Sequence, residues 1–289
     1  MPFKIDLLQA SFTTLTLIIF LGTVYSVKNS TYLDTSDPVI THLPHHLHNT
    51  HYFATKSNFL NVVFIKRAWA WTSSTFLFLW ITSPRQQRSV RRLSKWVAAT
   101  AAWLVFTSWF FGPALIDRFI AASGGECTIV LPSGASFPIP NEFCFTKSRL
   151  SPLTHPGLFA YPLLLPEGPW TTTPRMRRGH DVSGHIFLLT MSVLFLSDQL
   201  TSSLRSSPSA WTPGHKYAVI YTSAIIVIWL FAAYTTSVYF HTPLEKLTGY
   251  RECRYSTDVF LFSNCHGSVG CSRVCFHLDN LKEDISASL

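Results

Sequence analysis

Two histidines stand out because each lies beside a long apolar run. His185 belongs to the triplet Ser183-Gly184-His185, which leads directly into one such run. His241 follows another apolar run directly and has Glu245 four residues after it. Imidazole titrates near neutral pH, so one ring of a pair can act as base or nucleophile while the other acts as acid. This pairing suits a phosphoryl centre, where one ring attacks phosphorus and the other protonates the departing oxygen.

Neighbouring side chains can support both rings. In the triplet, the glycine lets the backbone approach a ligand closely, and the serine hydroxyl can donate to a phosphate oxygen. If the helix continues past Phe240, the spacing of His241 and Glu245 puts them on one face, where the carboxylate can fix the ring tautomer. Asp181 can do the same for either ring.

A phosphate substrate also requires nearby positive charge. The available cations are Lys66, Arg177, Arg178 and Lys246. The basic stretch that begins at Arg175 is either a solvated surface or a phosphate-docking patch, and both interpretations stay open. Lys66 either extends its ammonium to the membrane interface or faces an anionic ligand inside the helix bundle.

The composition indicates an integral membrane protein. Only 13% of the 289 residues are charged, against roughly a quarter in an average soluble domain. The formal charge of +8 therefore concerns membrane topology and anionic partners, and nothing resembles a nucleic-acid module. The histidine-rich loop at 29–56 lacks a regular period and a neighbouring acid, so a solvated loop is favoured over a metal site. We expect no metal and no cofactor.

Five apolar runs predict an all-α, polytopic transmembrane helical bundle. The expected spans are residues 7–27, 59–82, 96–116, 185–200 and 217–240. The connector at 84–95 carries five cations and no acid, which places it in the cytosol by the positive-inside rule. Counting crossings from there brings His185 and His241 to the same, lumenal side of the membrane.

Cysteines mark two further segments. Cys127 and Cys144 lie in the long polar loop at 121–182, where a disulfide and two free thiols are both open. The chain is expected to divide into a transmembrane domain at 1–250 and an atypical tail at 251–289. The tail holds four cysteines without the usual zinc spacing: Cys253, Cys265, Cys271 and Cys275.

Three stretches resemble the fat storage-inducing transmembrane (FIT) family. They are Gly179 to Leu189, Tyr239 to Lys246, and Asn61 to Thr72. The resemblance covers roughly residues 8–250. The ordered pair of histidine motifs is fairly specific for this family, whereas the apolar spans alone are not.

The resemblance implies a six-span protein of the endoplasmic reticulum membrane that is related to lipid phosphate phosphatases. Its implied substrate is fatty acyl-CoA, cleaved at the diphosphate on the lumenal side into acyl 4′-phosphopantetheine and adenosine 3′,5′-bisphosphate. The implied consequence is lipid-droplet formation and phospholipid balance, with the bilayer lipids as partners. By the same resemblance His185 is the leaving-group acid, and His241 with Glu245 is the nucleophile with its orienting carboxylate.

Two features depart from that pattern. The phosphatase motif has an arginine shortly before its second histidine, and residues 235–240 contain none. No run after Tyr250 is long enough to be the sixth span. An alternative function is a non-catalytic protein that binds and partitions diacylglycerol or triacylglycerol, which would need the apolar spans but not the histidines.

Overall fold

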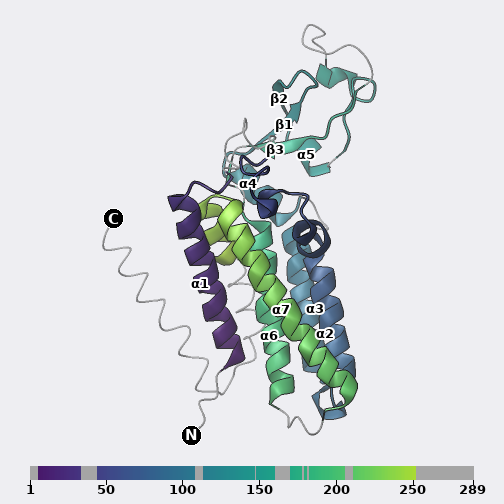
Figure 1. The fold of residues 1–289 in the computed structure, drawn as a ribbon. Helices are drawn as coiled ribbons and strands as arrows, with labels where there is room; N and C mark the ends of the chain where they lie inside the picture. The colour runs from purple at the N-terminus through teal and green to yellow at the C-terminus, as the bar shows by residue number, and fades with distance from the viewer. Residues whose placement is uncertain are drawn as a thin grey trace, which may run out of the picture.

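Five long helices form a bundle in the computed structural model (Figure 1). They are α1 (Leu7–Lys28), α2 (Ala68–Thr82), α3 (Val90–Thr107), α6 (Gly184–Leu204) and α7 (Pro213–Tyr239). The structure describes residues 6–33, 44–107, 113–146, 148–159, 170–177, 179–180, 182–205 and 211–251. Helix α6 packs against all four of the others, so it forms the centre of the bundle.

Three helices of the described chain are long and apolar enough to cross a membrane: α1, α6 and α7. They match three of the five expected spans closely. The span expected at 59–82 contains α2, which has 15 residues. Helix α3 carries Arg91, Arg92 and Lys95 within its 18 residues. The crossings assigned to α2 and α3 therefore stay predictions.

The span expected at 96–116 is not one helix. A second helix, α4 (Leu115–Ala122), begins after Pro113, and Ala114 has non-helical backbone angles. Proline lacks the N–H that a continuous helix needs, so the chain restarts here. Asp117 and Arg118, expected just beyond the span, lie inside α4.

Buried polar contacts hold α3 against α6. Arg92, only 6% exposed, donates from Nε to Gln199 Oε1 at 2.8 Å and from Nη2 to the Gln199 carbonyl at 3.2 Å. Lys95 pairs with Asp198 at 2.9 Å. The end of the basic connector expected at 84–95 therefore lies in the first turns of α3, where these partners satisfy two of its cations.

A small sheet lies at the end of the bundle where α6 begins and α7 ends (Figure 1). Its strands are β1 (Glu126–Val130), β2 (Ser136–Ile139) and β3 (Arg175–Arg177), with β1 in the middle and both pairings antiparallel. The expectation of an all-α fold is therefore correct only for the bundle. Strands of three to five residues are too short to show a clear period in the sequence.

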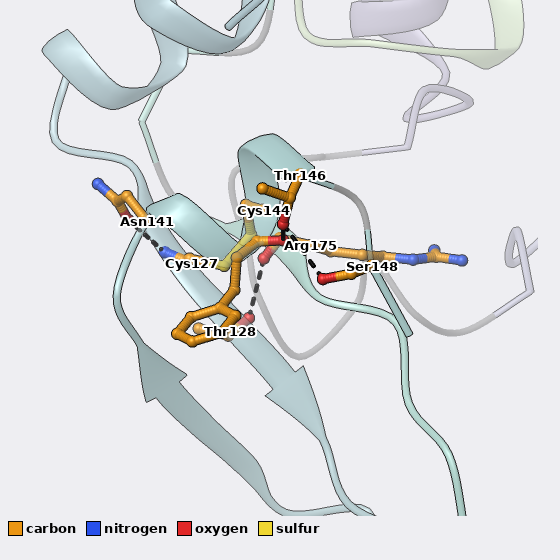
Figure 2. The surroundings of a disulfide bond; sticks show 8 residues. Cys127, Thr128, Asn141, Cys144, Thr146, Ser148 and Arg175 are labelled. Carbon is orange, nitrogen blue, oxygen red and sulfur yellow. Dashed lines mark hydrogen bonds between the residues drawn. A yellow bond between two sulfur atoms is a disulfide. The ribbon is translucent and has the colours of Figure 1, made fainter. Parts of the chain in front are cut away.

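A disulfide joins β1 to the short helix α5 (Glu142–Thr146). It links Cys127 to Cys144, whose Cα atoms are 5.8 Å apart (Figure 2). The Cys127 N–H donates to Asn141 Oδ1 at 2.9 Å. Of the two states left open by the sequence, the structure has the bonded one, and it stabilises the apolar core under the sheet.

Candidate functional site

His185 occupies the first turn of α6. Ser183 is the N-cap of this helix, and its hydroxyl accepts from the Ile186 N–H at 3.4 Å. Ser183 is also fully buried, so its hydroxyl serves as a helix cap inside the bundle. Gly184 has room for a Cβ at ordinary contact distances, 3.7 Å from Ile116 and farther from other atoms. The cap fixes where α6 starts and therefore where the half-buried His185 ring lies.

His241 lies in the break between α7 and a final helix at residues 243–251. The condition that the helix continues past Phe240 is not met, because Phe240 is extended and His241 has a left-handed φ of 62°. Thr242 begins the next helix in a capping box: Glu245 N donates to Thr242 Oγ1 at 3.4 Å, and Thr242 N donates to Glu245 Oε2 at 2.9 Å. The same carboxylate oxygen lies 3.3 Å from His241 Nδ1.

The two imidazoles lie side by side. Their ring centroids are 6.3 Å apart, with the planes tilted by 55°. The expected meeting of the two histidines at one end of the bundle is therefore present. Both are partly exposed, and the His241 side chain retains 13% of its accessible surface.

A backbone interlock keeps the pair together. Ser183 N donates to the Glu245 carbonyl at 3.1 Å, which ties the start of α6 to the helix after His241. On that helix, a Cβ placed on Gly249 would lie 2.5 Å from the Ser183 carbonyl oxygen. Any side chain there would push the two segments apart. Gly249 was not identified from the sequence, because only the tertiary contact shows why a glycine is needed.

Lys66 lies where the helix that leads into α2 is irregular. A π-helical turn (Leu60–Phe64) is followed by a 3₁₀ turn (Ile65–Arg67) before α2 begins. The Val63 carbonyl accepts from the Trp71 indole N–H at 2.9 Å. Such bulges re-aim side chains and recur at functional sites. Lys66 is exposed and, with His241, is one of the charged or titratable groups that act electrostatically on His185.

A second group of cations lies on and beside β3. Arg177 is 7% exposed, and burial together with Arg175 lowers the pKa of its guanidinium. Lys56 interacts electrostatically with both arginines. Its pKa is lowered mainly by burial and then by the positive charges of Arg175 and Arg177. Lys56 was not singled out in the sequence, since it comes from a loop more than 100 residues away.

Comparison with known proteins identifies the family to which this chain belongs. A family model described as fat storage-inducing transmembrane protein matches residues 49–221 and 205–255, which together are more than half of the chain. The chain belongs to the FIT family. The matched region contains both histidines, Glu245, Lys66 and the whole sheet.

Relatives of this FIT chain carry an enzyme name or a family name. An acyl-coenzyme A diphosphatase of Schizosaccharomyces pombe is 31% identical over 202 residues, covering 70% of this chain and 69% of that protein. One of Danio rerio is 28% identical over 202 residues, covering 68% of each. The fat storage-inducing transmembrane protein 1 of Sus scrofa is 23% identical over 214 residues, covering 72% of this chain and 63% of that protein. No solved structure matches the chain.

Lys246 of the FIT chain lies away from solvent. Its side chain is fully buried, and Nζ donates to Ser26 Oγ at 2.9 Å and to the Ser237 carbonyl at 2.6 Å. The ammonium also lies 5.6 Å from the centre of the Tyr32 ring. Burial lowers its pKa to about 8, with Glu245 acting in the opposite direction. These contacts tie the final helix to α1 and α7.

Some of the remaining site predictions fall outside the residues that the structure describes, and the others concern metal binding. Asp181 and Arg178 are not among the residues that the structure describes, and neither is the tail after residue 251. Within the described part of the chain, no group of three or more His, Cys, Asp or Glu side chains could hold a metal ion. His180, three residues before Ser183, lies 2.8 Å from Thr248 Oγ1 through its Nε2 and so adds to the interlock.

Proposed function

We propose that this FIT chain is a membrane-bound acyl-CoA diphosphatase whose catalytic groups are His185 and His241. The observation that carries the proposal is the 6.3 Å approach of the two rings, with a carboxylate on the second. The names of the Schizosaccharomyces pombe and Danio rerio relatives support this substrate class.

Glu245 favours His241 as the nucleophile. An ionised carboxylate only accepts hydrogen bonds, so its contact with Nδ1 requires the proton to be on that nitrogen. Nε2 then keeps its lone pair and can attack phosphorus. A phosphorus–nitrogen bond forms, the bridging phosphorus–oxygen bond breaks, and the departing phosphate oxygen takes a proton from His185.

Water completes the reaction. His185, now neutral, accepts a proton from a water molecule that attacks the phosphohistidine, and the phosphorus–nitrogen bond breaks. The sum is the addition of one water across the diphosphate of acyl-CoA. The products are acyl 4′-phosphopantetheine and adenosine 3′,5′-bisphosphate.

Cations from two parts of the chain are assigned to the phosphates. Lys66 acts electrostatically on His185 and is exposed, so it can neutralise charge that develops on the transferred phosphoryl group. Arg177, with Arg178 next to it in sequence, supplies bidentate contacts to the outer phosphate oxygens. These groups replace the arginine that residues 235–240 lack. We assign Lys246 to helix packing, because its ammonium already has two buried partners.

The proposed location is the endoplasmic reticulum membrane with the histidines facing the lumen. The disulfide between Cys127 and Cys144 suits an oxidising compartment, and it lies at the same end of the bundle as the histidines. The basic start of α3 lies at the opposite end, where the positive-inside rule expects the cytosol. The proposed role is to support lipid-droplet formation and phospholipid homeostasis.

Purified protein tests the enzyme directly. Acyl-CoA cleavage is followed for wild type, His185→Ala, His241→Ala and the control His155→Ala, whose ring packs on Phe143 near the sheet. We expect each site variant to lose about a thousandfold in rate and the control to keep the wild-type rate. A phosphorylated peptide containing His241, trapped by acid-free quenching, identifies the nucleophile. Equal rates in all four proteins would overturn the proposal.

A further inference from the structure

The C-terminal end of α7 is held by groups from other parts of the chain. The last helical bond runs from Phe240 N to the Thr236 carbonyl, so the next three carbonyls have no helical partner. All three are nevertheless satisfied. Their donors are Lys246 Nζ to Ser237 at 2.6 Å, Thr31 Oγ1 to Val238 at 2.7 Å, and both Leu33 N at 3.2 Å and His45 Nε2 at 2.8 Å to Tyr239.

Both ring nitrogens of His45 are used in this arrangement. Nδ1 accepts from the Leu47 N–H at 3.0 Å, and Nε2 lies 2.8 Å from the Tyr239 carbonyl, which can only accept. The ring must therefore be neutral, with its proton on Nε2. A proton on Nδ1 would point at the Leu47 N–H, and that bond would be lost.

The His45 ring is packed as well as bonded. It is 2% exposed, stacks on His46 at 4.5 Å, and meets the edges of Tyr239 and Phe240 at 6.2 and 5.9 Å. His46 in turn bonds to the Ser30 carbonyl at 3.0 Å. The loop is thus fixed to the two residues that come directly before His241.

His241 needs such a fixed neighbour. Its left-handed φ of 62° is sparsely populated for a residue with a Cβ and costs of order 1 kcal/mol unless the surroundings enforce it. The carbonyl that His45 binds lies two residues earlier, so the bond fixes the direction in which the chain leaves α7. That direction decides where the His241 ring lies relative to His185.

We propose that His45 is a positioning residue for His241, and that it acts only while its own imidazole is neutral. The proposal rests on the diphosphatase function proposed above, since it assigns His45 a part in the same site. His45 touches no substrate. It holds the α7 end so that the His241 ring stays beside His185.

The direction of the pH response follows from the groups around His45. Burial lowers its pKa from the usual value, His46 and Lys56 lower it further, and the backbone bond to Tyr239 opposes them. His45 therefore stays neutral at pH 7, and the clamp on α7 is intact there. As the pH falls below that lowered pKa, the ring gains a proton, the Leu47 bond is lost and His241 is released.

Kinetics separate positioning from binding. His45→Ala removes the donor, and we expect kcat to fall about tenfold or more with KM within about twofold. His45→Gln keeps a donor for the Tyr239 carbonyl and does not titrate, so it retains most of the neutral rate and loses less activity than wild type in acid. His48→Ala is the control: this exposed histidine of the same loop bonds to the His45 carbonyl and keeps the wild-type rate.

Hydrogen exchange of the full-length protein in detergent gives a readout that needs no activity. We expect faster exchange at residues 237–245 in His45→Ala, and wild-type exchange in His45→Gln and His48→Ala. Unchanged exchange in His45→Ala would overturn the clamp even if wild type hydrolyses acyl-CoA. Faster exchange with an unchanged kcat would overturn positioning. A wild type without hydrolase activity would remove the proposed function, while the exchange result would still decide the clamp.

Discussion

At the scale of single residues, one carboxylate carries two tasks. Glu245 closes the capping box with Thr242 and contacts the Nδ1 of His241 through the same oxygen. Proline at position 243 suits the first turn of this helix, where no N–H is required. The sequence Thr242-Pro243-Leu244-Glu245 is therefore a helix start that also fixes a ring tautomer.

Changing the charge of residue 245 tests that second task. Glu245→Gln keeps an oxygen for the Thr242 N–H but stabilises a charged imidazole less well. We expect kcat to fall about tenfold to a hundredfold with little change in KM, measured as steady-state acyl-CoA cleavage. In the comparison variant Thr242→Ala, the helix cap is weakened by about 1 kcal/mol and the carboxylate stays on the ring. Equal losses of kcat in both variants would contradict the tautomer role.

At the scale of elements, the apolar runs predicted helix ends accurately where a charged residue stands at each end of the run. The run predicted at 7–27 is α1 (Leu7–Lys28) because Asp6 caps its start and Lys28 ends it. The run predicted at 217–240 begins earlier, at Pro213, since Thr212 and Pro213 form an N-cap followed by a first-turn proline. That signature, a threonine directly before a proline, is present in the sequence.

The features of the site that the sequence did not predict depend on contacts between segments that are far apart in the chain. The meeting of His185 and His241 followed from counting crossings, but the reason for the Glu245 contact did not, because the helix breaks at Phe240. The need for glycine at 249 depends on Ser183, and the role of His45 depends on Tyr239. Periodicity and spacing carry no information about such pairs.

Lys246, on the final helix, bonds to α1 and α7. Its titration should therefore change the free energy of unfolding with pH. Its pKa is about 8 in the folded chain against 10.5 for an ordinary lysine. Between these values the unfolded chain holds a proton that the folded chain lacks, so the free energy of unfolding rises with pH. The rise has an upper limit of about 3 kcal/mol. The neutral amine still donates to Ser26 and Ser237, so the packing is kept.

Thermal unfolding in detergent between pH 7 and pH 10 measures this, with Lys246→Met as the reference that cannot titrate. We expect the stability of wild type relative to Lys246→Met to increase as the pH passes 8. Other groups that titrate in this range affect both proteins and cancel in the difference. A difference that stays flat or falls would show that the ammonium is solvated in the folded chain.

At the scale of the whole molecule, the histidines proposed as catalytic lie at one end of the bundle, and Arg177, proposed to bind phosphate, lies on the sheet. Arg175 and Arg177 lie on β3, an edge strand paired with β1. From β3 the chain continues to Gly179, where φ is 68° and a Cβ would lie 2.4 Å from the Ile120 carbonyl oxygen. The segment that leaves β3 is therefore packed closely against α4, four residues before the Ser183 cap. The position of Arg177 relative to the start of α6 thus depends on the sheet being folded.

The disulfide provides the test of this dependence. Closing the loop between Cys127 and Cys144, 17 residues apart, stabilises the sheet by about 3 kcal/mol. In Cys127→Ser/Cys144→Ser the strands lose this constraint, and we expect KM for acyl-CoA to rise severalfold while kcat at saturation changes less, since the histidines lie on the bundle. Dithiothreitol should reproduce the effect in wild type and add nothing in the double variant. A fall confined to kcat, with KM unchanged, would mean that the sheet supports the histidines and not the phosphates.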